Sequence, residues 1–576
     1  MKLLRVLGVL CALLVPAAAL DREAFTFTNY DLDVRVEPEQ QRLAVRGKLT
    51  LRNDSGAPQK NLVLQISSSL DWRSIQLSGK PVQFVSQPYT SDIDHTGSLS
   101  EAIVTLPKEV PPKGSVDLEI GYEGVVPLDL TRLTRIGVPE EQARHSDWDQ
   151  IGKTSSAVRG IGYVVWYPVA TESASFSETN EVFETVGRWK AREAPARMQV
   201  KLCDVQAGPP FQTMVMNEPL RFGVPGGMES GVQDKKYYAC ENHGFAPLGA
   251  TVPAFALGLY AVDSPEAAHI YHFAEHKPVA DDYALAIELS APFVREWLGQ
   301  ASLRFRVVEL ADIGAGPFES GSILFTPMAR GDSRMAQMSV VHQLAHATLQ
   351  SSRPWIYEGV AHFLQAADLQ RLSGRQAALD FMGLHRTALA EAEKALAQEK
   401  NPNTAADQSL VNTTREELYR SKAMFVWWML RDIIGEAALK KVLADYSAEQ
   451  DKEPSYLQHL IAAQTKQDLE WFFDDWVYRD RGLPDFKVDS VAQRPTVAGG
   501  AIVTVNISNL GNAGAEVPVT LRMEGGEASK RLLVRGESTA TVRFEAAATP
   551  MEVVVNDGSV PESDGSNNVF KIEPAK

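Results

Sequence analysis

The sequence predicts a multidomain α+β protein with three successive folded regions. From Phe25 to about Val262, apolar residues alternate with polar ones, which is the period of a β-strand buried on one face. From Asp263 to about Arg481, apolar residues recur every three or four positions, as on the buried face of an α-helix. After Gly482 the period returns to two. We therefore expect an antiparallel β domain, a mixed α/β domain and a C-terminal β-sandwich, in that order.

The composition is that of a folded globular protein. Apolar residues make up 44% of the 576 residues and charged residues 23%, which excludes wholesale disorder. Lys and Arg number 57 against 73 Asp and Glu, so the formal net charge is −16. Nucleic-acid-binding proteins are normally basic because they track phosphates, so we expect no nucleic-acid partner.

Residues 1–19 have the pattern of a secretory signal peptide. Lys2 and Arg5 make a basic start, Val6–Val15 is an apolar run, and the alanines that end at Ala19 offer a cleavage site. This run is too short to span a bilayer, and no later stretch approaches the roughly 18 apolar residues that a membrane helix needs. The sequence therefore predicts an exported, periplasmic or extracellular protein without a membrane span.

The first folded region, residues 20–262, shows the clearest strand pattern. Leu32, Val34 and Val36 alternate with polar neighbours, and Asn53–Gly56 makes a turn before the next apolar run. We find no cluster of nucleophile, base and orienting group here, so we expect a structural or substrate-flanking role.

Two cysteines, Cys203 and Cys240, remain after removal of the signal peptide. An oxidising compartment would allow them to pair. Pairing requires Cα atoms within roughly 7 Å, which the sequence does not establish. A disulfide and two separate buried thiols therefore both stay open.

The second region, residues 263–483, is expected to be mixed α/β. Two apolar strand-like stretches, Leu303–Leu310 and Ile323–Phe325, follow the first helical segment. The predicted amphipathic helices are Asp281–Trp297, Arg334–Gln350, Pro354–Arg371, Gln376–Ala397, Glu416–Ile434 and Ala437–Tyr446.

The third region, residues 484–576, is short and rich in turns. Val503, Val505 and Ile507 alternate with polar residues, and further alternating runs follow between Gly and Asn turns. This pattern predicts a small β-sandwich, whose surface is a candidate site for a protein partner.

The last turn of this region, residues 556–568, lacks the spacing of a calcium loop, so we expect a solvated turn, with calcium binding as the alternative.

Two histidines one helical turn apart mark a candidate metal site. His342 and His346 lie on one face of a predicted helix, where both ring nitrogens can reach one ion. The pair alone also fits two partly buried helix histidines. A second predicted helix carries Glu358, which eleven residues separate from His346, and that helix can fold back on the first. Two imidazoles, a carboxylate and an open fourth position make a catalytic zinc site, so we expect Zn²⁺. His362, one turn past Glu358, is expected to orient or pack.

With this pattern the chain resembles the membrane alanyl aminopeptidase family of gluzincin zinc metallopeptidases, whose signature is H-E-x-x-H followed by a glutamate in an N-E-G context. The resemblance implies that His342, His346 and Glu358 are the zinc ligands, with Tyr357 in place of the family's Asn. It also implies a saddle-like N-terminal β domain, a thermolysin-like catalytic domain and a C-terminal β-sandwich. The implied activity is removal of N-terminal amino acids from peptides by zinc-activated water.

Two further segments resemble the same family. The segment from Gly316 to Ser320 resembles its G-A-M-E-N strand, which implies that Gly316 and Glu319 contact the substrate and that Glu319 holds the free α-amino group. The segment from Leu418 to Lys422 resembles its Y-x-K-G segment, which implies that the Tyr419 hydroxyl stabilises the oxyanion. The expected partner is a peptide with a free N-terminus.

Position 343 departs from the family pattern. Gln343 replaces the glutamate that takes a proton from the attacking water and passes it to the leaving amine. A neutral amide can hydrogen-bond water but cannot accept the proton. General acid–base catalysis contributes about 10²–10⁴-fold to a rate. We therefore predict a metal-loaded site that binds peptide N-termini and hydrolyses them slowly or not at all.

The sequence leaves three explanations of Gln343 open. The protein is a natural pseudopeptidase, or an active enzyme that carries one substitution, or an enzyme with another base such as Glu319 or Tyr357. The third is disfavoured because a base must lie within about 3 Å of the water, and Glu319 suits the amine better. Two functions follow: a weak zinc exopeptidase, or a non-catalytic module that binds peptide N-termini or a protein partner through the same cleft.

Overall fold

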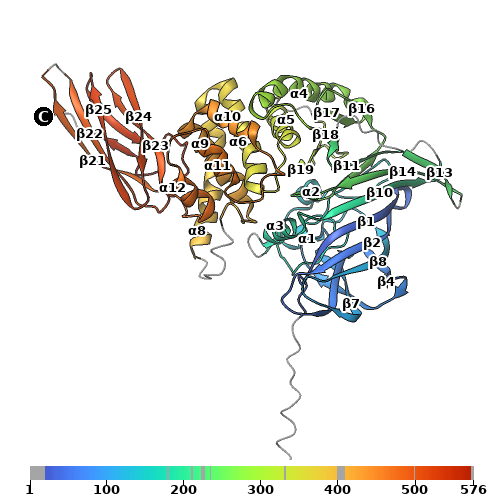
Figure 1. The fold of residues 1–576 in the computed structure, drawn as a ribbon. Coiled ribbons are helices and arrows are strands. Elements are labelled where there is room, and N and C mark those ends of the chain that lie inside the picture. Colours follow the sequence, from blue (N-terminus) through green and yellow to red (C-terminus); the bar gives the residue numbers. More distant parts are fainter. Residues whose placement is uncertain are drawn as a thin grey trace, which may run out of the picture.

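The computed structural model describes residues 20–177, 181–208, 212–221, 228–233, 235–329, 333–398, 409–497 and 500–572. It is a multidomain α+β protein in which helices lie between a β-rich N-terminal region and a pair of C-terminal sheets (Figure 1). The predicted signal peptide, residues 1–19, lies outside the described residues. Among the described helices, none is both long and apolar enough to cross a membrane.

The N-terminal region is built on an eight-stranded sheet with the order β13-β14-β10-β1-β2-β8-β4-β5. Its strands are β1 (Phe25–Glu37), β2 (Arg42–Asn53), β4 (Leu70–Leu77), β5 (Lys80–Pro81), β8 (Ser115–Val125), β10 (Arg197–Gln206), β13 (Met228–Gln233) and β14 (Lys236–Phe245). Leu32, Val34 and Val36 of β1 are buried, in agreement with the predicted period of two. The expectation of a purely antiparallel region is wrong, because β1 and β10 pair in parallel. Parallel neighbours need a crossover, and the long chain between them supplies it.

Two small sheets and three helices complete this region. The sheets are β3-β7-β6 and β11-β15-β9. Their strands are β3 (Gln59–Ser67), β6 (Gln83–Thr90), β7 (Ser98–Val110), β9 (Ser155–Val158), β11 (Thr213–Met216) and β15 (Phe255–Gly258). The helices are α1 (Thr131–Arg135), α2 (Glu140–Ser146) and α3 (Glu181–Glu193), with a 3₁₀ turn η1 at Pro38–Gln40.

Cys203 and Cys240 form a disulfide bond. They lie directly opposite each other on the antiparallel neighbours β10 and β14, with Cα atoms 4.0 Å apart. Of the two alternatives that the sequence leaves open, the structure has the bridge.

The central region combines a sheet with a group of helices. The sheet order is β16-β17-β18-β20-β19, and β12 pairs with β18. Its strands are β12 (Leu220–Arg221), β16 (Ala261–Asp263), β17 (Ala268–His272), β18 (Leu303–Glu309), β19 (Phe318–Ser320) and β20 (Ile323–Thr326). The helices are the 3₁₀ turn η2 (Ala274–His276), α4 (Lys277–Leu298), α5 (Ser333–Thr348), α6 (Pro354–Ser373), α7 (Arg375–Gly383), α8 (Arg386–Gln398), the π-helix η4 (Glu417–Lys422), α9 (Ala423–Ile434), α10 (Glu436–Asp445), α11 (Tyr456–Ala462), α12 (Glu470–Phe473) and the π-helix η5 (Asp474–Tyr478).

Most predicted helices of this region are present, and two differ in detail. The predicted helix Gln376–Ala397 is two helices, because α7 ends at Gly383 and the Leu384 N–H bonds back to the Phe381 carbonyl in a tighter turn. The predicted helix Glu416–Ile434 begins with the π-helical η4 before it continues as α9. A π-helical turn inside a helix is rare and is frequent at functional sites.

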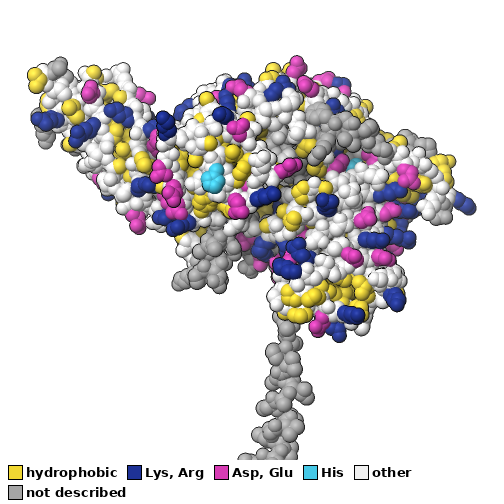
Figure 2. All heavy atoms as spheres, in the orientation of Figure 1, with side chains coloured by type: hydrophobic (Ala, Val, Ile, Leu, Met, Phe, Trp, Pro, Cys, Tyr) yellow, Lys and Arg dark blue, Asp and Glu magenta, His cyan; other side chains and the backbone are white. Residues whose placement is uncertain are grey.

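The C-terminal region consists of two sheets, β21-β22-β25 and β24-β23-β26-β27. Their strands are β21 (Phe486–Pro495), β22 (Ala501–Asn509), β23 (Ala515–Met523), β24 (Gly526–Val534), β25 (Ser538–Ala546), β26 (Pro550–Val555) and β27 (Val569–Lys571). The buried residues of the two sheets join one hydrophobic core with the central helices, whereas the N-terminal region has a core of its own. Acidic and basic side chains are mixed over the face shown in Figure 2.

Candidate metal centre

Helices α5 and α6 bring three of the predicted residues together. The chain turns back between Thr348 and Pro354, and the two helices pack against each other. His342 Nε2 and His346 Nε2 lie 2.9 Å apart, and Glu358 Oε2 lies 3.8 Å from each of these nitrogens. Both histidines are buried, and the Glu358 side chain is 15% exposed. The predicted ligand set therefore converges on one point.

These residues fit a zinc ion. Tetrahedral zinc with ligands at about 2.0–2.2 Å holds its ligand atoms about 3.3 Å apart, and the observed separations lie on either side of that value. Gln343 supplies independent support. Both polar atoms of its buried amide lack a hydrogen-bond partner among the residues that the structure describes. Buried polar groups normally have partners, so both polar atoms of this amide are free to bond to a polar ligand.

The charge states of the ligands also suit a metal. Burial, followed by the charge of His342, lowers the pKa of His346 to about 3, so its imidazole is neutral at pH 7. Burial acts to raise the pKa of Glu358, but Arg420 and the histidines outweigh it and hold that pKa well below the ordinary value. A neutral imidazole and an ionised carboxylate are the forms that bind metals.

Packing around the cluster fixes the orientation of these side chains. The Tyr357 ring stacks on the His346 ring, with centroids 3.9 Å apart. Gly359 lets α6 approach α9 closely, because a Cβ there would lie 2.6 Å from the Ala423 Cβ and 3.0 Å from Trp427 Nε1. Gly359, which follows Glu358, is therefore needed for the close packing of α6 against α9.

Glu319 and Gly316 come from the segment that leads into and forms β19. Glu319 Oε2 lies 3.1 Å from His342 Nε2, so this carboxylate belongs to the same cluster, and its side chain is 27% exposed. Gly316 differs. Its N–H donates to the His145 carbonyl at 2.8 Å, and its own carbonyl accepts from Trp148 Nε1 at 3.0 Å. The observed contacts of Gly316 therefore anchor this segment to the N-terminal region, and its role in substrate binding stays a prediction.

The π-helix η4 carries Tyr419 and an arginine that sequence reasoning missed. Arg420 Nε lies 3.1 Å from Glu358 Oε2, and Arg420 Nη1 pairs with Glu416 one turn earlier. Burial raises the pKa of Tyr419, so its hydroxyl stays protonated at neutral pH. Within the described part of the chain, this hydroxyl makes no hydrogen bond, and its catalytic role stays a prediction. The Glu416 to Arg420 spacing of four was the available signal for Arg420.

His362 is closer to the cluster than the sequence indicated. Its ring centroid lies 4.8 Å from that of His342, and its Nδ1 lies 3.0 Å from the Glu358 carbonyl, to which it can donate. His342, Glu358 and His362 can each offer a ligand atom within 4.8 Å of the others. His362 is therefore a second candidate ligand as well as a neighbour of His342.

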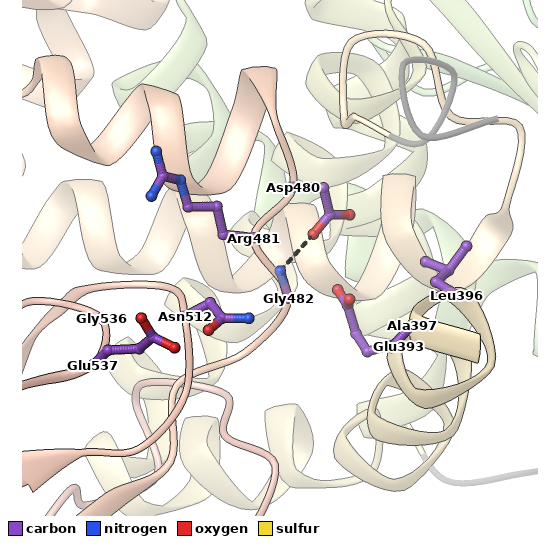
Figure 3. A pocket seen from close by; sticks show the side chains of 9 residues that line it. All are labelled: Glu393, Leu396, Ala397, Asp480, Arg481, Gly482, Asn512, Gly536 and Glu537. Carbon is purple, nitrogen blue, oxygen red and sulfur yellow. Dashed lines mark hydrogen bonds between the residues drawn. The ribbon is translucent and has the colours of Figure 1, made fainter. Parts of the chain in front are cut away.

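A separate cavity of about 500 Å³ lies where α8 meets the C-terminal sheets (Figure 3). Glu393 and Asp480 contribute carboxylates to its wall, and Gly482 N–H donates to Asp480 at 3.1 Å. The buried Lys422 ammonium pairs with both carboxylates. Their charge is thus compensated within the protein, and none of the predicted site residues lines this cavity.

The fold is similar to that of a solved aminopeptidase structure. The crystal structure of Legionella pneumophila aminopeptidase A in complex with aspartic acid matches 94% of this chain with a TM-score of 0.58 and 12% sequence identity. The match covers 59% of that chain, so this chain spans less than two thirds of its length. A mutant M1 zinc metallopeptidase from Deinococcus radiodurans, bound to a Tyr-Ser-Ala substrate, matches 80% of this chain and 96% of its own, with a TM-score of 0.47 and 15% identity. The sequence matches no protein-family model and no curated protein.

Proposed function

We propose that this chain is a zinc metallopeptidase-like protein that binds the N-termini of peptides and hydrolyses them slowly or not at all. One observation carries the proposal: His342, His346 and Glu358 converge on one point. The likeness of the fold to an aminopeptidase supports it. Export is part of the proposal, supported by the signal-like residues 1–19 and by a disulfide of the kind found in oxidising compartments.

In this proposal the side chains of the cluster have different roles in peptide binding. A bound zinc ion would supply Lewis-acid polarisation of the scissile carbonyl and would lower the pKa of water. Glu319, partly exposed beside His342, can accept hydrogen bonds from a peptide ammonium. The Gln343 amide offers N–H donors and a carbonyl acceptor, which can pair with the C=O and N–H of a peptide group. It cannot take a proton, so the same residue that favours binding removes the general base.

A second function, non-catalytic capture of peptide N-termini, is favoured by one specific observation. Gln343 is fully buried and its side-chain polar atoms have no partner among the described residues, so a peptide that reached this amide would gain hydrogen bonds. On this alternative the fold and the metal site serve recognition. The two functions differ only in whether product is released.

Amino-acid release from a panel of aminoacyl arylamides tests the proposal. The zinc-loaded mature protein is compared with its Gln343→Glu variant, which restores a base. We expect the variant to cleave at least about a hundredfold faster, since general acid–base catalysis supplies about 10²–10⁴-fold. Gln300→Glu, at an exposed position, makes the same charge change away from the cluster and should leave the rate unaltered.

The other outcomes are equally informative. If neither protein cleaves, peptide binding is measured directly, and micromolar binding without product supports the capture function. If the natural protein is as fast as the Gln343→Glu variant, the argument that Gln343 removes the base is wrong. If neither protein binds zinc or peptide, the proposed function is wrong.

A further inference from the structure

One oxygen of Glu358 has two competing kinds of partner. Oε2 faces His342 Nε2 and His346 Nε2 at 3.8 Å each, which is the direction from which a metal would bind. The same atom lies 3.1 Å from Arg420 Nε. The carboxylate that would serve the metal therefore already has a permanent cation beside it, because a guanidinium does not lose its proton in proteins.

Arg420 is held in this position by its surroundings. It lies in the π-helix η4, which packs against α6, and Glu416 one turn earlier pairs with its Nη1. The Arg420 side chain is 31% exposed and that of Glu358 15%, so the pair is shielded from most of the solvent. Shielding strengthens both the attraction between these two charges and the repulsion between Arg420 and a further cation.

We propose that Arg420 is a built-in counter-charge that sets the metal occupancy of this site. This inference rests on the proposed zinc site. With Arg420 in place, a divalent cation must share the Glu358 oxygen with a guanidinium and is repelled by its charge. Without a metal, the same guanidinium compensates the buried carboxylate, so the site keeps its structure. Arg420 is thus a positioning residue for Glu358 that weakens zinc binding and stabilises the metal-free protein.

The affinity for zinc ions alone tests this proposal, measured by competition with a chromogenic chelator. Replacement of groups next to metal ligands typically weakens binding about 10–100-fold. For Arg420→Gln we expect the opposite sign, with zinc bound at least about tenfold more tightly than by the natural protein. Damage to the fold would weaken binding, so the sign separates the proposal from a structural lesion.

A matched control and a second substitution at position 420 test whether the change in zinc affinity comes from the Arg420 charge. Arg371→Gln removes a guanidinium that pairs with Asp368 further along α6, and it should leave zinc affinity unaltered. Arg420→Ala removes the same charge with a smaller side chain, and we expect the same tightening. If both Arg420 variants bind zinc equally to or more weakly than the natural protein, the inference is wrong while the proposed zinc site stands.

Thermal unfolding in EDTA and in excess zinc gives a readout that needs no affinity measurement. Zinc should raise the Tm of the natural protein by less than it raises the Tm of Arg420→Gln. Arg420→Gln should lose Tm in EDTA, because Glu358 is then buried without a counter-charge, and zinc should restore it. If neither protein binds zinc, the proposed function is wrong and this inference is wrong with it.

Discussion

At position 343 a neutral amide follows His342 in the helix that also carries His346. His346 is neutral because burial lowers its pKa, and Glu358 is ionised because Arg420 and the histidines outweigh its burial. His346 and Glu358 therefore have the charges that metal ligands need, and the amide of Gln343 cannot accept a proton. The proposed role of Gln343 concerns the rate of hydrolysis and that of Arg420 concerns metal affinity, so the two proposals can be tested separately.

Glu193 gives a pH-dependent prediction at the residue scale. Its carboxyl is fully buried at the end of α3, and burial raises its pKa to about 8, against 4.5 for the exposed group. The folded state then binds a proton that the unfolded state releases, so the free energy of unfolding falls as pH rises between about 4.5 and 8. Glu193→Gln stays neutral, and we expect its Tm to exceed that of the natural protein at pH 9 and the difference to shrink towards pH 5.

The control for this comparison is Glu39→Gln, which changes an exposed glutamate. Its Tm difference from the natural protein should stay small and nearly constant with pH. A Glu193→Gln variant that is destabilised equally at pH 5 and pH 9 would show that the raised pKa does not govern the stability of this helix.

How much of the site the sequence predicts differs from residue to residue. The spacing of His342 and His346 predicts that they share a face, because helix periodicity fixes which side chains lie together. The approach of Glu358 depends on how α6 packs against α5. The ion-pair partner of a carboxylate cannot be predicted in this way. Arg420 reaches Glu358 from a helix 62 positions further on, and no local pattern states which acid a given arginine meets. The backbone hydrogen bonds of Gly316 are equally unpredictable from local sequence, because their partners, the His145 carbonyl and Trp148 Nε1, lie far away in the chain.

At the element scale, the contact between α6 and α9 sets where Glu358 points. Gly359 sits against Ala423 and Trp427, with no room for a methyl group. We expect Gly359→Ala to force the helices apart and to lower the free energy of unfolding by about 1–3 kcal/mol. Because Glu358 is the neighbouring residue, zinc affinity should fall as well. Chemical denaturation and chelator competition measure the two effects.

Gly383→Ala is the matched control for this prediction. Gly383 ends α7 and has no described atom within 4 Å of the position of an added Cβ. This variant should unfold with nearly the same free energy as the natural protein or slightly more, because alanine restricts the unfolded chain. If the two variants behave alike, close packing at Gly359 does not position Glu358.

Element bounds are predicted well where burial is one-sided and poorly where the chain departs from regular geometry. The predicted helix Pro354–Arg371 starts where α6 starts, because proline at the first helical position is a local signal. The apolar residues keep their helical spacing across the π-helical η4 and across the break after Gly383. The sequence pattern therefore predicts one continuous helix at each place. The parallel pairing of β1 and β10 likewise depends on a crossover of distant segments, which a local period does not encode.

At the scale of the whole molecule, two separate hydrophobic cores divide the chain. One lies in the N-terminal region, and the other joins the central helices to the C-terminal sheets. A smaller cluster that includes Trp148 and Phe325 lies where the two regions meet. Since each large core buries its own apolar surface, we expect the two to unfold as separate units in calorimetry, and the metal cluster belongs with the second.

The disulfide between Cys203 and Cys240 lies in the first unit only, which makes the division testable. A bridge that closes a loop of this length stabilises by about 2–4 kcal/mol, mainly by restricting the unfolded chain. We expect a reductant, or the double variant Cys203→Ala with Cys240→Ala, to lower the Tm of one calorimetric transition. If zinc binds the cluster on α5 and α6 as proposed, it should raise the Tm of the other transition. A single transition that responds to both reductant and zinc would show instead that the small cluster at the junction couples the two cores into one cooperative unit.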